Sequence, residues 1–362
     1  MLFPYTYVPH SMEKMQEFID FIFFEVWCKA PGNGNFRFEL FDGNVELKGL
    51  MESFCYSDTK GGDFFYGHVE GIYNLFAVLT ETQIDQLKQW YKANNDIEKV
   101  CANDSAIQIA HYIDIEAISS DLRDRLASFF VKLYSNLDVA ALREKIGRID
   151  EHYHAFMQVN TTGKCPFCGI GDMLGVYHTK REAYDHYLPK ALYPFNSINF
   201  RNLVPACHHC NSSYKTTQDP SYSPKDPTGE INRRKAFYPY NSTAHAIEIQ
   251  IDLSHSDLDK LNPDDIQLAF GPDVVREEID TWREVYGIDE RFKAKCCDES
   301  GGRYWIVKVM DEWQENGRTP SDFMDTLNRL TVKQPLAESN FLQKAFLEGC
   351  ERAGLFQDKL TQ

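Results

Sequence analysis

The chain of 362 residues has a composition that excludes several classes of protein. Hydrophobic residues make up 43% and charged residues 25%, which is the balance of a globular protein and excludes a disordered or low-complexity chain. The formal net charge of -16 excludes a protein that coats nucleic acid over its whole surface. The length allows two or three structural units.

The N-terminus and the strongest apolar run show no sign of export or of a membrane span. The opening MLFPYTYVPH lacks the basic segment and the small-residue cleavage site of a secretory signal. Residues 18–27 are too short to cross a bilayer and include Asp20 and Glu25. We therefore expect a cytoplasmic protein with no membrane contact. Most of its ten cysteines should then be reduced, so a closely spaced pair indicates metal or redox chemistry.

Residues 1–150 are predicted to form a mixed, mostly helical N-terminal domain. Ser11 can cap a helix that runs to about Ala30, and residues 36–47 read as two strands around a turn at Asp42 and Gly43. Apolar residues recur every three to four positions in three further segments, which predicts helices at 82–95, 120–137 and 138–157.

Residues 151–240 have few long periodic runs, so something other than a large core must hold this segment together. It follows a break at 159–164 and closes in a loop rich in proline and small residues at 217–230. Ten basic residues against six acidic ones give residues 161–240 a charge of +4, which leaves -20 for the remainder. This local charge is expected of a segment that touches phosphate.

Residues 241–362 are predicted to form a mainly helical C-terminal region. Ile247, Ile249 and Ile251 alternate with polar neighbours, which is typical of a half-buried strand. Two helical faces follow, and Thr319-Pro320 and Gly354 bracket two closing helices. The two faces are marked by Val275, Ile279, Trp282 and Tyr286, and by Trp305, Val309 and Trp313. The chain as a whole is therefore predicted to be α+β.

Two CxxC pairs stand out among the ten cysteines. Cys165 with Cys168 and Cys207 with Cys210 offer four thiolates, the number that a tetrahedral structural zinc ion requires. A redox role is less favoured, because neither pair follows a strand in a βαβ unit. The spacing therefore predicts a structural zinc site. His178, His208 and His209 remain possible substitute ligands.

An Asp-His pair and two asparagines lie between and beside these cysteines. Closing a metal site would bring Asp185 and His186 close to Asn202 and Asn211. A carboxylate and an amide oxygen suit a divalent ion such as Mg²⁺, whose other positions are filled by water and phosphate. A neutral imidazole can deprotonate water at physiological pH. These residue types together predict a hydrolytic site for phosphodiesters.

The pattern CPFC, YDHYLPK and NFRNLVPACHHCNSSYK over residues 165–215 resembles the HNH endonucleases, the ββα-metal nuclease family. The resemblance implies a hairpin that bears the base, a loop, and a helix that completes the metal site, with a four-cysteine zinc site as its staple. His186 would be the general base, and Asp185 and Asn211 would bind one Mg²⁺ or Mn²⁺ ion. Asn202 would brace the loop, and Lys215 could reach a phosphate.

Two features complicate this resemblance. The closing histidine of the family is Asn211 here, which leaves the metal preference open. Neighbouring residues of a strand face opposite sides, so Asp185 and His186 can serve one phosphate only if the chain bends, and Pro189 favours such a bend. Asn196 and Asn199 in the same loop are alternatives for the bracing role of Asn202.

Two functions from different classes follow from the sequence. The first is a metal-dependent DNA endonuclease, and the resemblance implies a role in bacterial restriction or anti-phage defence. The second is a zinc-stabilised adaptor that binds nucleic acid or protein without cutting. The acidic flanks would repel a duplex, so we expect a protein partner, of the ATPase kind that the resemblance implies, or a second copy of the chain.

Overall fold

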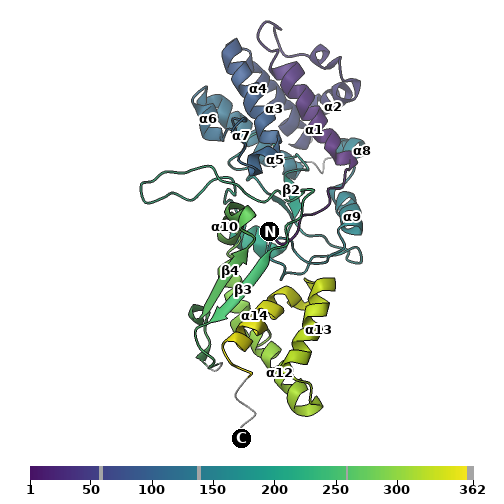
Figure 1. Cartoon of the computed structure of the whole chain (residues 1–362). Helices are drawn as coiled ribbons and strands as arrows, with labels where there is room; N and C mark the ends of the chain where they lie inside the picture. The colour runs from purple at the N-terminus through teal and green to yellow at the C-terminus, as the bar shows by residue number, and fades with distance from the viewer. Residues whose placement is uncertain (57–59, 137–139, 258–259, 357–362) are drawn as a thin grey trace.

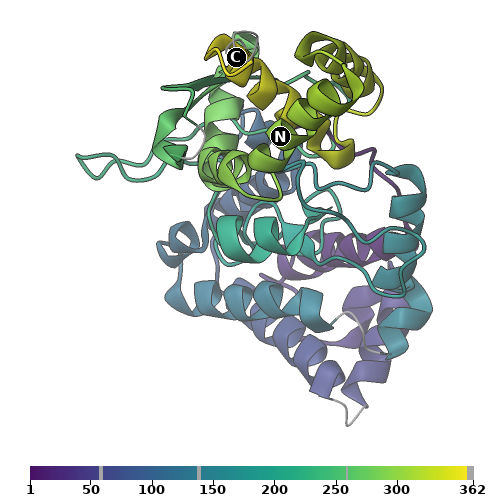
Figure 2. The same ribbon diagram turned by 90° about the horizontal axis from the view of Figure 1, so that it is seen from below.

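The computed structural model describes residues 1–56, 60–136, 140–257 and 260–356 and shows a helix-rich α+β protein (Figure 1). Two small antiparallel sheets, each of two strands, lie among the helices of this part of the chain. Seen from below, the N-terminal helices and the C-terminal helices lie on opposite sides of the middle segment (Figure 2). Of the described helices, none combines the length and the apolar character that a membrane crossing requires.

The N-terminal region is a group of helices around an aromatic core. Trp27 stacks on Phe76 with ring centroids 5.9 Å apart, and Phe129 meets Trp27 edge to face. The helices are α1 (Lys14–Phe21), α2 (Val45–Cys55), α3 (Lys60–Phe76), α4 (Glu81–Asn95), α5 (Ile97–Cys101), α6 (Tyr112–Glu116), α7 (Ser120–Leu133) and α8 (Ala140–Ile146). The core forms because each long helix turns an apolar face inward.

The predicted first helix is confirmed, and the predicted strands at 36–47 are wrong. Helical structure runs through η1 (Ser11–Glu13), α1 and η2 (Ile22–Trp27), although His10 supplies the cap and not Ser11. Residues 36–47 instead contain a short 3₁₀ turn and the start of α2. The side chain of Asn44 accepts a hydrogen bond from the Leu47 backbone amide, so this cap starts a helix where a strand was expected.

The predicted helices at 82–95 and 120–137 correspond to α4 and to α7 with its 3₁₀ extension η4 (Tyr134–Asn136). The helix expected over 138–157 is broken into α8 and α9 (Ile149–Val159). Gly147 separates them with a φ of 79°, and a Cβ there would lie 2.8 Å from Ser11 Oγ. Residues 137–139 of these predictions lie outside the described residues.

The middle segment has little regular structure. It holds β1 (Tyr184–His186), β2 (Leu203–Pro205) and the π-helical turn η5 (His209–Lys215), and residues 217–230 form the loop that the sequence predicts. The first residues of the chain pack against it, because the Leu2 amide donates to the Pro166 carbonyl at 2.9 Å. The start of the chain therefore helps to hold the loop that carries Cys165 and Cys168, which we call the cysteine loop.

The C-terminal region is mainly helical, as predicted, and the predicted strand belongs to a hairpin. Strand β3 (Glu248–Leu253) pairs antiparallel with β4 (Ile266–Gly271), which was not predicted. The helices are α10 (Arg276–Val285), α11 (Ile288–Cys297), α12 (Gly302–Asn316), α13 (Pro320–Lys333) and α14 (Asn340–Arg352). Helix α14 packs closely on β3, because a Cβ at Gly349 would lie 2.3 Å from the Ile251 carbonyl oxygen.

Candidate functional site

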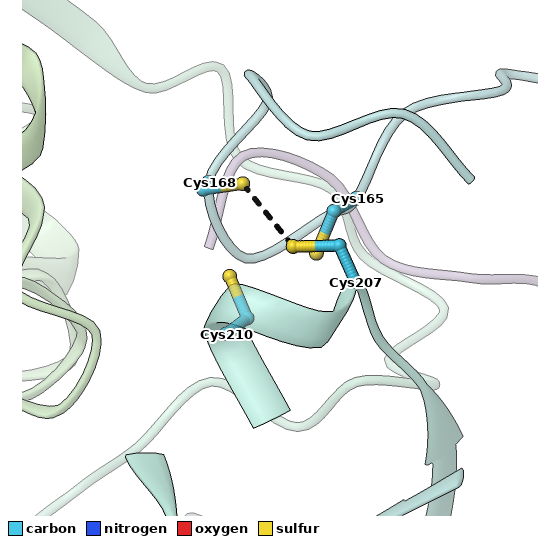
Figure 3. Close-up of side chains that lie close together, drawn as sticks. All are labelled: Cys165, Cys168, Cys207 and Cys210. Carbon is cyan, nitrogen blue, oxygen red and sulfur yellow. Dashed lines mark hydrogen bonds between the residues drawn. The ribbon is translucent and has the colours of Figure 1, made fainter. Parts of the chain in front are cut away.

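The four cysteines of the two CxxC pairs converge on one buried point (Figure 3). Their Sγ atoms all lie within 4.8 Å of one another, and Cys168 Sγ is 3.9 Å from Cys207 Sγ. Tetrahedral coordination with Zn–S bonds of ~2.3 Å places sulfurs ~3.8 Å apart, whereas a disulfide requires ~2.05 Å. The set therefore matches a structural metal ion such as zinc and not a disulfide bond.

Neighbouring groups prepare these sulfurs for a metal ion. The Gly171 amide donates to Cys168 Sγ at 3.3 Å, and the Arg291 guanidinium of α11 donates to Cys210 Sγ at 3.1 Å. Hydrogen bonds from the other thiols, Cys165 first, lower the pKa of Cys168. The loop also requires glycine at 171, because a Cβ there would lie 2.8 Å from Cys207 Sγ. Such outer donors fix the ligand geometry of a metal site.

The histidines considered as substitute ligands are not part of this cluster. His208 and His209 are exposed, and His178 is exposed with its Nδ1 3.2 Å from the Gly175 carbonyl oxygen. Across the described residues, the four cysteines are the one set of histidine, cysteine and acidic side chains with metal-binding geometry. The cysteines alone are therefore the candidate ligands.

The Asp-His pair lies on the short hairpin of β1 and β2. Asp185 pairs with Val204 and His186 with Leu203. The alternation of a strand sends the two side chains to different sides. Asp185 contacts η5, and His186 contacts the loop that joins the two strands. The structure therefore places the two residues side by side in the chain but in different surroundings.

Asp185 forms a buried ion pair with Lys215. Its Oδ1 accepts a hydrogen bond from Lys215 Nζ at 3.1 Å, and the same ammonium group donates to the His186 carbonyl at 2.9 Å. Lys215 is fully buried and Asp185 is 4% exposed. Burial raises the pKa of Asp185, and Lys215 opposes the rise. The expectation that Lys215 reaches a phosphate is thus replaced by a structural role, because its side chain is enclosed.

The His186 imidazole is held in one orientation. Its Nε2 donates to the Ser197 carbonyl at 2.9 Å, and its ring packs edge to face on Tyr134 at 4.9 Å. Burial first, and then the charge of Lys190, lowers the pKa of His186 to about 3. The ring is therefore neutral at physiological pH, with the proton on Nε2. No hydrogen bond to Nδ1 is present among the described residues.

Asn202 makes the bracing contacts of the loop. Its Oδ1 accepts from the Leu188 amide at 2.7 Å, and its Nδ2 donates to the Leu188 carbonyl at 3.0 Å. The two alternatives point elsewhere: Asn196 donates to the Asn94 carbonyl at 3.2 Å and Asn199 to the Asn95 carbonyl at 3.1 Å. Asn202 thus closes the loop on itself, and the other two asparagines tie the loop to α4.

Replacing Asn202 should loosen this loop. Asn202→Ala is expected to lower the free energy of unfolding by about 2 kcal/mol, because it leaves the buried Leu188 amide and carbonyl without partners. Urea unfolding measures the change. Asn199→Ala is the matched control, since its side chain is only half-buried. A loss in the control as large as that in Asn202→Ala would contradict the bracing role.

Asn211 lies on η5, one turn before Lys215. Its backbone amide donates to the Cys207 carbonyl at 3.0 Å, and its backbone carbonyl accepts from the Thr216 amide at 3.1 Å. The residues around the cysteine site and the π-helical turn therefore fix its backbone. Its side chain is half-buried. Over the described ranges no hydrogen bond joins it to Asp185 or His186.

A second buried histidine supports the hairpin from behind. His152 of α9 lies with Nδ1 beside the Tyr184 hydroxyl of β1 and with Nε2 3.2 Å from the Val8 carbonyl oxygen. His152 falls in the helix that the sequence predicts over 138–157, and the sequence assigns it no role. His152 and Tyr184 are 32 positions apart, and no motif joins them, so the contact could not be predicted from the sequence.

The stability of the protein should depend on pH through His152. Burial lowers the pKa of His152 to about 4, below its unfolded value of ~6.5. Between these values the unfolded state binds a proton that the folded state does not, so stability is complete above pH ~6.5 and falls by up to about 3 kcal/mol towards pH 4. Unfolding of His152→Gln at several pH values should show a weaker dependence. The exposed His154→Gln is the control and should keep the wild-type slope.

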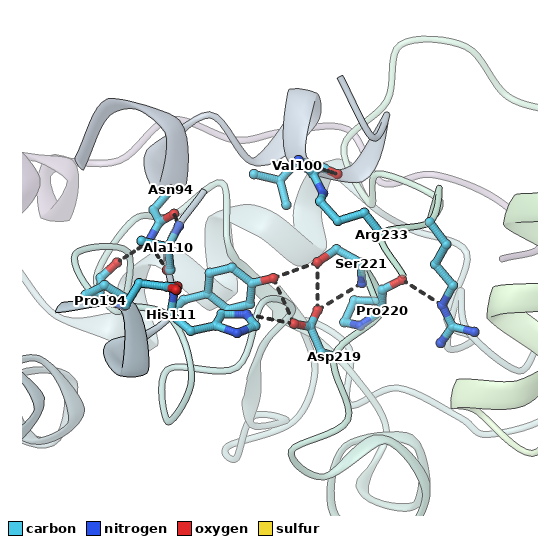
Figure 4. A network of polar contacts seen from close by, with 12 residues as sticks. Asn94, Val100, Ala110, His111, Pro194, Asp219, Pro220, Ser221 and Arg233 are labelled. Carbon is cyan, nitrogen blue, oxygen red and sulfur yellow. Dashed lines mark hydrogen bonds and ion pairs between the residues drawn. The ribbon is translucent and has the colours of Figure 1, made fainter. Parts of the chain in front are cut away.

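A polar network around Asp219 was also not predicted from the sequence (Figure 4). Asp219 Oδ2 lies 3.2 Å from His111 Nε2 and accepts from the Tyr193 hydroxyl at 2.8 Å. The Ser221 hydroxyl donates to Asp219 Oδ1 at 2.8 Å. Serine, histidine and aspartate here do not form a nucleophilic triad, because Ser221 bonds to the carboxylate and not to the imidazole. The network ties the loop after η5 to the start of α6.

Comparisons with known proteins give one partial match. The chain is 40% identical over 85 residues to "Protein ea31" of Escherichia phage lambda. The matched stretch is 23% of this chain and 24% of the phage protein, so the chain spans about a quarter of the length of this curated relative. No family model matches the sequence, and no solved structure matches it.

Proposed function

We propose that residues 165–215 form a metal-dependent endonuclease module of the HNH type that acts on DNA. The motif order in the sequence supports this proposal, together with an antiparallel hairpin followed by a helical turn. The cysteine cluster joins the two parts, since Cys207 follows β2 and Cys210 lies within η5. The effector of a bacterial defence or restriction system is the biological role that we propose for it.

The orientation of His186 carries the proposal. With Nε2 donating to the Ser197 carbonyl, the ring keeps its free electron pair on Nδ1. A nitrogen of this kind can accept a proton from water as the water attacks a phosphodiester. His186 is thus the general base of the proposed reaction, and Asn202 holds the loop that positions it.

Asp185 and Asn211 are the proposed ligands of the catalytic divalent ion. Asp185 Oδ2 is buried without a hydrogen-bond partner, and Asn211 offers an amide oxygen, so the donor set suits Mg²⁺ or Mn²⁺ completed by water and phosphate. Bound there, the ion would stabilise charge on the phosphate and on the departing 3′ oxygen. The chain itself supplies the base, the orientation of the base and the two oxygen donors.

A basic cavity beside Tyr134 is the proposed phosphate contact. It has a volume of 270 Å³ and is lined by Arg143, Arg148 and Arg181, and Asp150 in the same wall pairs with Arg181 at 2.8 Å and with Arg148 at 3.7 Å. The ring of Tyr134 forms part of the same wall and packs on His186. Arginines that neutralise phosphates position a strand without reading its sequence. In this proposal the arginines contact the phosphate, which is the role that the sequence analysis gave to Lys215.

An acidic groove in the N-terminal region supports the proposed protein partner. The groove has a volume of 740 Å³, and five acidic residues line it against Lys92 and Arg201. The acidic residues are Glu13, Glu17, Asp20, Asp96 and Glu98. Such a surface repels DNA and attracts a basic protein segment. An ATPase subunit or a second copy of the chain is the partner that we propose.

The buried ion pair of Asp185 and Lys215 favours a second candidate function, the non-catalytic adaptor. One oxygen of the proposed ligand is already engaged by Lys215 at 3.1 Å. In an adaptor, Asp185 would keep its ion pair with Lys215 and would bind no metal ion. The hairpin beside the zinc site would then only present a binding surface. The two functions differ in whether a phosphodiester bond is cut.

The test is cleavage of a supercoiled plasmid by the purified zinc-loaded protein. With Mg²⁺ or Mn²⁺ present, we expect nicked and then linear DNA, and without a divalent ion we expect none. The assay is run with and without the proteins encoded by the neighbouring genes, because the proposed partner would bring DNA to the site. An intact plasmid in every arm, together with retained zinc and a gel shift of the DNA, would establish the adaptor instead.

A further inference from the structure

A second basic cavity lies where the cysteine loop meets the C-terminal helices. Its volume is 330 Å³, and it is lined by residues of the cysteine loop, of α11 and α12, and of the turn before α14. The loop and α14 touch, because a Cβ at Gly169 would lie 3.0 Å from the ring of Phe341. We call this cavity the lysine pocket, defined by Lys164, Lys295, Lys308, Ser339 and Gln343.

Three lysines give the lysine pocket a positive charge. Lys164 Nζ is held by Asp172 at 2.6 Å, and Lys295 Nζ donates to the Ser300 carbonyl at 3.1 Å and lies 4.0 Å from Asp298 Oδ2. Lys308 is exposed and forms no ion pair with any described residue. Glu338 is the one acidic residue among those that line the cavity. Lysines gathered in this way attract an anion, and lysine is a common partner of phosphate.

A buried amide faces the same space without a partner. Gln343 of α14 is 4% exposed, and its side chain has no hydrogen bond within the described residues. Ser339 is 6% exposed, and its hydroxyl likewise has none there. The polar atoms of both side chains are not fully enclosed, so they meet the space of the cavity and can hydrogen-bond to a ligand there.

The backbone beside these groups is strained. Glu338 and Ser339 have φ values of 49° and 59°, and both lie in the left-handed region that residues other than glycine rarely adopt. This turn puts the Ser339 side chain at the cavity wall. Strain of this kind gathers at ligand sites, where the binding geometry compensates for it.

We propose that the lysine pocket binds a nucleoside phosphate. The lysines would hold the phosphate, and the Gln343 amide would bind polar edges of the base. Tyr304, which lines the cavity and is 56% exposed, offers a ring for the base to stack on. The volume lies at the small end of ligand pockets, ~300–1,000 Å³, and suits one nucleotide. The ligand is either a free nucleotide or one nucleotide of a single strand.

Binding assays without divalent ions test this proposal and do not depend on any nuclease activity. The probes are ATP and a 5′-phosphorylated hexanucleotide of single-stranded DNA, each titrated into the full-length zinc-loaded protein by calorimetry. ATP binding with no binding of the hexanucleotide identifies a free nucleotide as the ligand. Binding of the hexanucleotide alone identifies a strand as the source. Failure of both probes to bind at millimolar concentration overturns the proposal.

Two variants and a control assign the binding to the lysine pocket. Lys308→Ala and Gln343→Leu are each expected to weaken binding of the active probe about tenfold, since each removes one ligand contact. Lys344→Ala is the control. Lys344 is the neighbour of Gln343 in the sequence but does not line the cavity, so this variant should bind the probe as the wild type does. Circular dichroism checks that the variants are folded. Equal affinities in all three variants would place the ligand elsewhere and overturn the proposal.

Discussion

His186→Ala is expected to lower plasmid cleavage by about 10²–10⁴-fold while the protein keeps its fold and its zinc. The variant removes the nitrogen that would accept a proton from the attacking water, and it leaves the four cysteine sulfurs untouched. Cleavage rates on a supercoiled plasmid measure the effect. Zinc content and circular dichroism, measured on the same preparation, show whether the loss is chemical or structural.

The matched control for this variant is His178→Ala. His178 is exposed and belongs to the same middle segment, but it contacts neither the hairpin nor the cysteines through any described hydrogen bond. Its cleavage rate should equal that of the wild type. A His186→Ala protein that is folded, zinc-loaded and fully active would contradict the assignment of the general base.

Loss of the zinc site is expected to unfold the middle segment. Cys207→Ser removes one of four converging sulfurs, and structural zinc contributes about 10–16 kcal/mol of apparent binding free energy in small domains. Between α9 and β3 the described chain has only two three-residue strands and one π-helical turn, and the cysteine cluster joins its two halves. Hydrogen exchange should show that amides of residues 160–215 lose protection, while those of α7 and α12 keep theirs.

The exposed Cys55 provides the control for the zinc variant. Cys55→Ser should retain one zinc ion per chain by elemental analysis and the exchange pattern of the wild type. Chelation of zinc from the wild-type protein should reproduce the Cys207→Ser pattern. Full protection of residues 160–215 in a zinc-free protein would show that the segment is held by other contacts.

The sequence predicts well the features that depend on spacing. The cysteine pairs converge as expected, because a two-residue spacer allows both sulfurs to reach one ion. Helices such as α4 are found because apolar residues recur at helical spacing, and the structure shows that Thr80 caps this helix. Helix α3 was not predicted, because glycines in KGGDFFYGHVEG obscure its periodicity although Phe65, Val69 and Ile72 are buried on one face.

The sequence predicts less well the features that depend on distant contacts. Lys215 was expected to reach a phosphate, yet its side chain is buried in an ion pair with Asp185, thirty positions earlier. The strand reading of residues 36–47 followed the local alternation and overlooked the cap at Asn44. The unpartnered Gln343 lies on a well-predicted helix, but only the three-dimensional fold brings the cysteine loop against it.

Anomalous diffraction from crystals grown with zinc and soaked in Mn²⁺ tests the central claim most directly. The account predicts two separate metal peaks. Zinc should lie at the centre of Cys165, Cys168, Cys207 and Cys210, and manganese should lie between the Asp185 carboxylate and the Asn211 side-chain amide oxygen. A zinc peak with no manganese at Asp185, while Lys215 keeps its ion pair there, would contradict the account.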